Sequence, residues 1–222
     1  MPKDTNKKGK GKSKSPLSYE VHGHQSTLTR PADEEQQLKQ QWRKLQELKE
    51  VTLAPVGKPD EKVVFFEGQD VFIVAPGTPI SGDAPLPGDR YWKAKIIEMR
   101  GNPEELDSDG WLQCIARVAW YYSAKDLDDQ QWLPKPLSKS DLAIVKCLGR
   151  YELVLSDHDA LVPMSTIAGL ADVVKFDDTK YKPELNVAPH KFNVHPQDWF
   201  HRFDLKTKTK SGIPQLLVSA SV

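Results

Sequence analysis

Hydrophobic and polar residues alternate along residues 112–122, and a period of two predicts a β-strand with one buried face. The apolar phase of this strand ends in two large aromatic residues, Trp120 and Tyr122, which would project to the same side. Tyr121 lies between them and would project to the opposite side. Two aromatic rings at the end of a strand can close a hydrophobic core, or they can form two walls of a pocket for a cation. Both interpretations remain open at this point.

Shorter β-type segments recur through the middle of the chain, separated by turn signals and by loops rich in Pro and Gly. The segments that predict strands are residues 63–66, 71–75, 91–99, 112–122, 151–155 and 173–174. A last ordered element is expected around residues 198–205. Loops are expected over residues 76–88 and 102–110. Short strands without a repeating strand–helix–strand order favour an all-β fold, a small barrel with short peripheral helices.

Two segments have helical periodicity instead. Residues 33–51 begin with acidic residues and carry apolar residues three or four positions apart, which predicts an amphipathic helix. The apolar positions of this helix are Leu38, Trp42, Leu45 and Leu48. It would either pack on the outside of the domain or bind a partner. A second, shorter helix is expected to begin at Ser138 or Ser140 and to end at Gly149.

Charge is distributed unevenly, although the 222-residue chain has a formal net charge of +0. The first 15 residues carry six Lys against one Asp, so residues 1–30 are predicted to be a disordered basic tail. Such a tail can contact DNA weakly, act as a nuclear import signal, or stay solvated without a specific partner. The chain is then divided into this tail, a helix and linker over 31–55, a β domain over 56–210 and a C-terminal tail over 211–222.

The two cysteines and the absence of long apolar runs indicate the compartment. Cys114 and Cys147 lie in apolar surroundings and have no neighbour at CxxC spacing, so we expect buried free thiols in a reducing environment. No run approaches the roughly 18 apolar residues of a membrane span, and no signal-peptide pattern begins the chain. We therefore expect a soluble intracellular protein that does not contact a membrane.

The sequence lacks the common catalytic and metal-binding motifs. The six His include no HExxH pair, and there is no P-loop, GxGxxG or GxSxG motif. His158 lies between Asp157 and Asp159, but neighbours on a strand point to opposite faces and no nucleophile accompanies them. We expect no catalytic residues, no metal and no cofactor.

A third aromatic residue can join the pair at the strand end. Trp92 lies in the predicted strand 91–99, whose alternation places Lys93 and Lys95 on the opposite face. If this strand is a neighbour of strand 112–122, Trp92 approaches its two aromatic residues. Three rings at right angles would suit a quaternary ammonium, whose contact with aromatic faces is worth about 2 kcal/mol when desolvated.

Three segments resemble the bromo-adjacent homology (BAH) domain. They are GQDVFI at residues 68–73, WKAKI at 92–96 with VAWYY at 118–122, and ELVLSDH at 152–158, which continues into VPMSTIAG at 162–169. WFHRFD at residues 199–204 is similar more weakly. The resemblance covers about residues 60–206, and its most specific part is the last long motif.

The resemblance implies a distorted β-barrel of a nuclear, chromatin-associated protein that mediates protein contacts. One subset of the family, which includes readers of fungal and plant type, binds methyl-lysine of histone tails through an aromatic cage. By this resemblance the cage would be formed by Trp92, Trp120 and Tyr122. Tyr91 and Tyr121 are candidate additional aromatic residues.

The same subset holds the histone peptide with a Ser-Asp-His-x-Asp stretch, which implies peptide-binding roles for Ser156, His158 and Asp159. The chain departs from that pattern at Ala160, where the family has Asp, so the peptide register and the mark can differ. The implied function is reading of a methylated histone H3 tail, most closely the Polycomb-type trimethyl mark, in gene silencing. Nucleosomes or chromatin complex subunits would be the partners. Family members without a cage serve as docking surfaces, so the alternative is a scaffold in a repressive chromatin complex.

Overall fold

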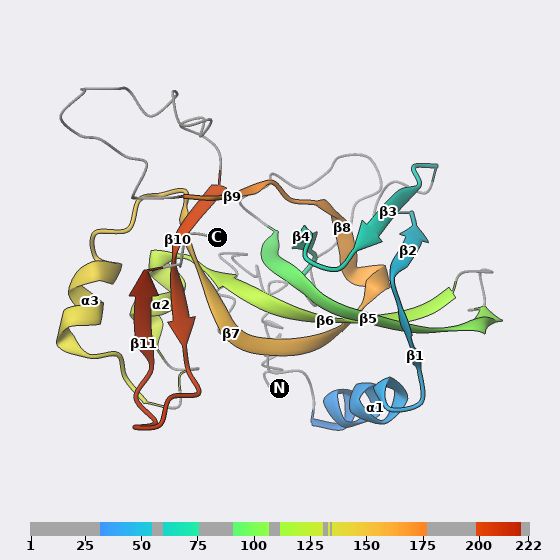
Figure 1. Ribbon diagram of the computed structural model, residues 1–222, viewed down its shortest axis with the longest axis horizontal. Coiled ribbons are helices and arrows are strands. Elements are labelled where there is room, and N and C mark those ends of the chain that lie inside the picture. The colour runs from blue at the N-terminus through green and yellow to red at the C-terminus, as the bar shows by residue number, and fades with distance from the viewer. Residues whose placement is uncertain are drawn as a thin grey trace, which may run out of the picture.

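The computed structural model describes residues 32–54, 60–75, 91–106, 112–130, 133, 135–176 and 199–218. Within these ranges the chain is mostly β-strand with short helices (Figure 1), which confirms the predicted β-rich class. The elements are α1 (Ala32–Trp42), β1 (Gln46–Leu48), β2 (Glu50–Leu53), β3 (Val63–Phe66), β4 (Asp70–Ile73), β5 (Trp92–Leu106), β6 (Leu112–Tyr122), α2 (Ala124–Asp129), α3 (Lys139–Val145), β7 (Glu152–Pro163), the 3₁₀ turn η3 (Met164–Thr166), β8 (Ile167–Leu170), β9 (Val173–Lys175), β10 (Trp199–Lys206) and β11 (Gln215–Val218). None of the described helices has the length and apolarity needed to cross a membrane.

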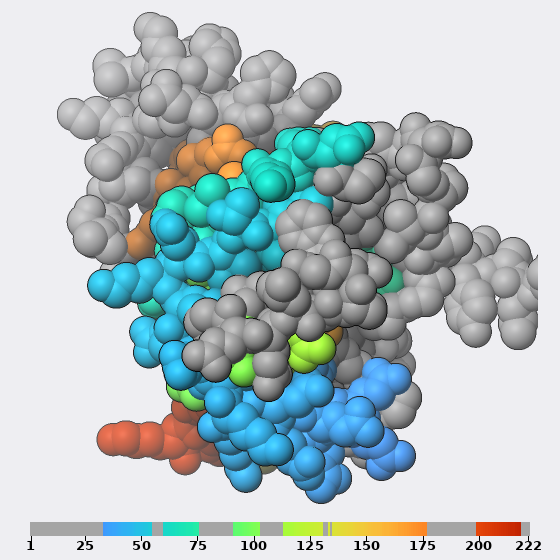
Figure 2. All heavy atoms as spheres, turned by 90° about the vertical axis from the view of Figure 1, so that its right-hand side faces the viewer, coloured from blue at the N-terminus to red at the C-terminus, as the bar shows by residue number. Residues whose placement is uncertain are grey.

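One nine-stranded sheet forms most of the structure. Its strand order is β11-β10-β7-β6-β5-β4-β8, with β1 added to β5 and β9 added to β10. β2 and β3 form a separate two-stranded sheet, which lies above α1 on one side of the molecule (Figure 2). β10 runs parallel to β7 and to β9, and the other pairs are antiparallel. Among the described strands the order does not return to its start, so the sheet is not closed and the prediction of a barrel is wrong in this respect.

The segment from β8 to β9 joins the two sides of the curved sheet (Figure 1). β8 pairs with β4 and β9 pairs with β10, and only two residues separate β8 from β9. The Ala171 N–H donates to the Asp70 carbonyl at 2.8 Å, and the Phe176 N–H donates to the His201 carbonyl at 2.8 Å. Strands far apart in the sheet order are therefore held close together on the face that this segment covers.

The two faces of the sheet bury different groups of side chains. Trp120 and Tyr122 belong to the larger hydrophobic cluster. Tyr121 belongs to a smaller cluster with Leu153 and Val173, beneath the β8–β9 segment. The alternation predicted for strand 112–122 is thus confirmed at its aromatic end.

The helix predicted over residues 33–51 is wrong in its length. α1 ends at Trp42, and the next residues form β1 and β2, which pair with β5 and β3. The Arg100 guanidinium lies 4.6 Å from the centre of the Trp42 ring and donates to the Trp42 carbonyl at 3.4 Å. This contact provides a partner for a carbonyl at the helix end, while strand pairing satisfies the following backbone. α1 is largely exposed on the outside of the domain.

Strand pairing also overrides the loop expected over residues 102–110. β5 continues to Leu106, which lies opposite Leu112 of β6, so the acidic residues 104–105 belong to a strand. Within the C-terminal tail predicted over 211–222, residues 215–218 form β11, which pairs with β10. The predicted tail over 1–30 and the predicted loop over 76–88 lie outside the described residues.

The short helices follow local capping. α3 begins after Ser138 as predicted, because the Ser138 hydroxyl accepts from the Asp141 N–H at 3.1 Å. It ends at Val145 rather than at Gly149. α2 was not predicted, although Ser123 and Asp126 form a reciprocal capping box at its start.

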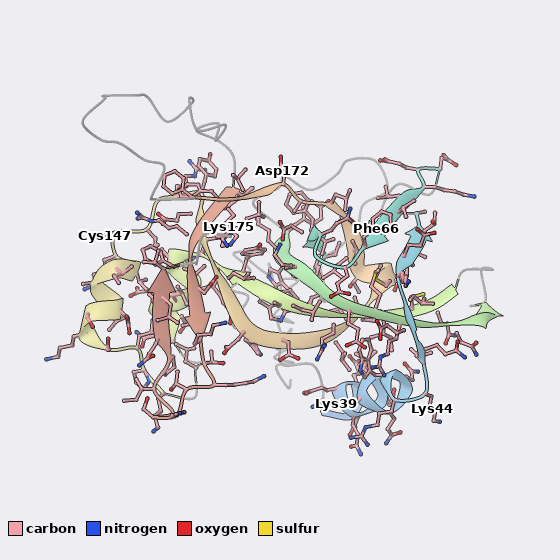
Figure 3. All side chains as sticks on the ribbon, viewed as in Figure 1. Lys39, Lys44, Phe66, Cys147, Asp172 and Lys175 are labelled. Atoms are coloured by element: carbon pink, nitrogen blue, oxygen red, sulfur yellow. The ribbon has the colours of Figure 1, made fainter. Side chains whose placement is uncertain are left out.

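The two cysteines have different surroundings. Cys114 is buried as predicted, but the prediction for Cys147 is wrong, because this residue is exposed beyond the end of α3 (Figure 3).

Candidate functional site

The pairing of β5 with β6 brings two of the predicted cage residues together. Ala94 lies opposite Trp120, so Trp92, two residues earlier, emerges on the same face. The ring centres of Trp92 and Trp120 are 5.7 Å apart, and their planes meet at 86°. The approach of Trp92 to Trp120 that strand alternation predicted is therefore present, and the two rings meet at nearly a right angle.

Tyr122 connects this aromatic group to His158 on β7. The Tyr122 hydroxyl and His158 Nδ1 are 2.6 Å apart, and the two ring planes differ by only 4°. Burial, and secondarily the charge of Asp126, raises the pKa of Tyr122 above its usual range. Burial also lowers the pKa of His158, and the charge of Lys208 lowers it further, while Asp159 and Asp157 raise it by smaller amounts. The hydrogen bond joins the Tyr122 hydroxyl to the imidazole of His158, and its direction depends on the tautomer of that ring.

A bulge in β7 places His158 in this position. Ala119 of β6 lies opposite Asp159, whereas Tyr121 lies opposite Leu155. Two steps along β6 thus correspond to four along β7, which leaves β7 with two extra residues. Such an irregularity redirects side chains, and it is stabilised by the Ser156 hydroxyl, which accepts from the His158 N–H at 2.8 Å.

The remaining residues of the predicted peptide-binding stretch have separate roles. Ser156 is buried, and its hydroxyl contact lies within the bulge. Asp159 is exposed and pairs with Lys208 at 3.0 Å. Asp157, which the sequence did not mark as a site residue, accepts from the Thr207 N–H at 2.7 Å and from its hydroxyl at 2.6 Å. The stretch is thereby anchored to the end of β10, with His158 and Asp159 at the surface.

The three predicted cage rings are closed in this structure. The exposed fractions of Trp92, Trp120 and Tyr122 are 5%, 1% and 1%. The indole N–H groups of Trp92 and Trp120 are buried and have no hydrogen-bond partner. An unpaired buried donor costs about 1–3 kcal/mol. Hydrophobic packing of the rings therefore does not explain why these two N–H groups are left without an acceptor. A ligand can enter between the rings only if they move apart.

Tyr91 and Tyr121 do not join this group. The Tyr121 hydroxyl donates to Asp70 Oδ1 at 2.9 Å on the opposite face, and burial, followed by the Asp70 charge, raises its pKa above the usual range. The Tyr91 ring contacts Phe72, with the ring centres 5.5 Å apart. These two tyrosines therefore lie outside the group of Trp92, Trp120 and Tyr122.

The described residues contain no group of three or more His, Cys, Asp or Glu side chains arranged to hold a metal ion. Comparison with known proteins adds no assignment, because no family model matches the chain and no curated protein matches it significantly.

Proposed function

We propose that this protein is a BAH-type chromatin reader that binds a trimethyl-lysine of the histone H3 tail in the nucleus and supports gene silencing. The mark most consistent with the resemblance is the Polycomb-type repressive one. The observation that carries the proposal is the link from the right-angled pair Trp92–Trp120 through Tyr122 to His158. The aromatic group ends beside the segment that resembles the peptide-binding stretch of the family.

The chemistry of the three rings suits a trimethylammonium group. Each ring face is electron-rich, and a trimethylammonium keeps its positive charge while being weakly hydrated. An unmodified lysine loses more hydration energy on entering the same space, so a trimethylated peptide should bind more tightly. The closed rings must separate for binding, and the Tyr122–His158 contact lies where the group meets the surface.

The surface beside the rings suits a basic peptide. Asp159 is exposed on the bulge of β7, and its partner Lys208 is also exposed. A lysine or arginine of a histone tail can replace Lys208 as the partner of this carboxylate at small cost, because exposed ion pairs contribute only about 0–1 kcal/mol. The Lys-rich residues 1–30, which lie outside the described ranges, would add weak contacts to DNA.

A second candidate function is a protein-interaction scaffold in a repressive chromatin complex. The near-complete burial of the three rings favours it, because a cage that never opens is a hydrophobic core. In this case chromatin proteins would bind other surfaces of the domain, such as the exposed helix α1.

Neighbouring tyrosines provide a matched test of the two functions. Tyr122→Phe and Tyr121→Phe each remove one buried hydroxyl hydrogen bond, but on opposite faces of β6. Alanine variants are less suitable, because truncating a buried aromatic side chain costs about 3–5 kcal/mol of stability.

For a reader, calorimetry should show binding of a trimethyl-lysine histone H3 peptide and weaker binding of the unmodified peptide. Tyr122→Phe should change the affinity for the trimethyl peptide about threefold to tenfold, because its hydrogen bond to His158 lies where the rings must separate, while Tyr121→Phe leaves the affinity unchanged. No binding by the native protein, or equal effects of the two variants, would support the scaffold.

A further inference from the structure

Lys93 is a buried lysine on the face of β5 opposite to Trp92. Only 4% of its surface is exposed. Its ammonium lies 3.8 Å from the centre of the Trp199 ring and 5.6 Å from that of Phe72. It also donates to the Tyr91 carbonyl at 3.1 Å. Since burying an ammonium is unfavourable without compensating contacts, its surroundings constitute a cation site.

The walls of this site come from strands that are distant in the sheet order. Phe72 belongs to β4 and Trp199 to β10, which the curvature of the sheet and the β8–β9 segment bring together (Figure 1). The Tyr91 ring packs against Phe72 at 5.5 Å, and the Tyr151 ring packs edge-on against Trp199 at 5.3 Å. All four aromatic residues are partly exposed, so the site reaches the molecular surface.

We propose that Phe72, Tyr91 and Trp199 form a second ammonium-binding site, occupied here by Lys93, which accepts a mono- or dimethylated lysine of a partner protein when Lys93 leaves it. The lysine stem is long and flexible, so the ammonium can rotate out to water while β5 stays paired. The site shares no residue with the group of Trp92, Trp120 and Tyr122, and the inference does not depend on the function proposed for that group.

The methylation state follows from the acceptor in the site. The Tyr91 carbonyl accepts an N–H from the ammonium, and a mono- or dimethylammonium keeps at least one N–H for this bond. A trimethylammonium has none and would leave the carbonyl without that partner. Methylation also reduces the hydration that an incoming ammonium must lose, which favours a methylated lysine over an unmodified one. The second site should therefore prefer intermediate methylation states, unlike a cage built from rings alone.

The test uses Lys93→Ala, which removes a propylammonium-sized part of the side chain. The probes are propylammonium and its N-methyl, N,N-dimethyl and N,N,N-trimethyl derivatives, with binding measured by NMR titration. Lys93→Ala should bind the monomethyl and dimethyl probes about tenfold more tightly than the native protein does, because the internal competitor is absent. The trimethyl probe should bind several-fold more weakly than the dimethyl probe.

Two further changes in the Lys93→Ala background locate the site. Trp199→Ala should abolish probe binding, whereas Trp120→Phe should leave it unchanged. Absence of binding in Lys93→Ala, equal or tighter binding of the trimethyl probe, or binding that survives Trp199→Ala would each overturn the proposal.

If Lys93→Ala does not fold, the native protein provides the readout. The side-chain protons of Lys93 next to the Trp199 ring should have a ring-current shift. As N,N-dimethylpropylammonium is added, this shift should return toward the value of an exposed lysine. Such a change would show that the probe displaces the Lys93 ammonium. A shift that stays constant at saturating probe would overturn the proposal.

Discussion

The ion pair between Glu152 and Arg202 gives a quantitative prediction about what joins β7 to β10. The Glu152 side chain is 4% exposed and pairs with Arg202, which is 31% exposed. Glu152 also accepts from the Gly149 N–H at 3.0 Å. His201 lies opposite Leu153 and Phe203 opposite Val154, so Arg202 is an extra residue in the register. The bulge allows its guanidinium to reach the buried carboxylate.

Removing Arg202 should lower the free energy of unfolding more than removing the charge of Glu152. Arg202→Met leaves a buried carboxylate without its cation, which costs about 3–5 kcal/mol. Glu152→Gln keeps an acceptor for the Gly149 N–H and leaves a guanidinium that water can reach, so we expect a loss of about 1–3 kcal/mol. The double variant should lose less than the sum of the single changes, with a coupling energy of about 2 kcal/mol or more.

Urea unfolding followed by circular dichroism at neutral pH measures all four free energies of unfolding. The m-values should agree among the variants, so that the midpoints report stability. A coupling energy below about 0.5 kcal/mol, within ordinary additivity, would refute the reasoning. An Arg202→Met variant as stable as the native protein would do the same.

Three further predictions follow from single residues. Gly101→Ala should lower the free energy of unfolding by about 1–3 kcal/mol, because its Cβ would lie 2.7 Å from Cys114 Sγ and 3.2 Å from a backbone oxygen of β6. Gly149→Ala is the control, because its Cβ would meet nothing closer than 3.8 Å. If urea unfolding shows the same loss of free energy of unfolding for both variants, the packing explanation is contradicted. Burial raises the pKa of Cys114 to about 11, whereas Cys147 is exposed. A disulfide reagent should therefore modify one thiol in the native protein and two in urea. Rapid modification of both thiols in the native protein would be inconsistent with the fold. Burial lowers the pKa of His158 from its usual 6.5, so the unfolded chain binds this proton more readily and stability should fall as the pH drops from 6.5 through the folded pKa. If the stability of His158→Gln falls with pH as steeply as that of the native protein, His158 is not the group responsible.

The strands could be predicted from the sequence wherever one face is apolar. The alternation through Trp120 and Tyr122 gave the correct faces, and the pairing that it suggested for Trp92 is present. The length of α1 could not be predicted in this way, because the spacing of Trp42, Leu45 and Leu48 continues the helical stripe. Pairing of β1 with β5, a contact distant in sequence, decides between these conformations.

The second aromatic site shows what alternation cannot supply. A lysine next to Trp92 in sequence indicates a solvated face, and this inference holds only if nothing covers that face. Here β8 and β9 cover that face, and the Lys93 ammonium lies over the Trp199 ring. The bulge that aims His158 at Tyr122 is equally invisible in the sequence, since it follows from how β6 and β7 pair.

The charge of the ligand tests the central claim most directly. Calorimetry would compare a histone H3 peptide carrying trimethyl-lysine with the same peptide carrying its uncharged tert-butyl isostere, which has nearly the same shape. If Trp92, Trp120 and Tyr122 open to form a cage, the charged peptide should bind about tenfold or more tightly, in line with about 2 kcal/mol of cation–π attraction in a desolvated site. Equal affinities for the two peptides, or no binding of either, would contradict the account.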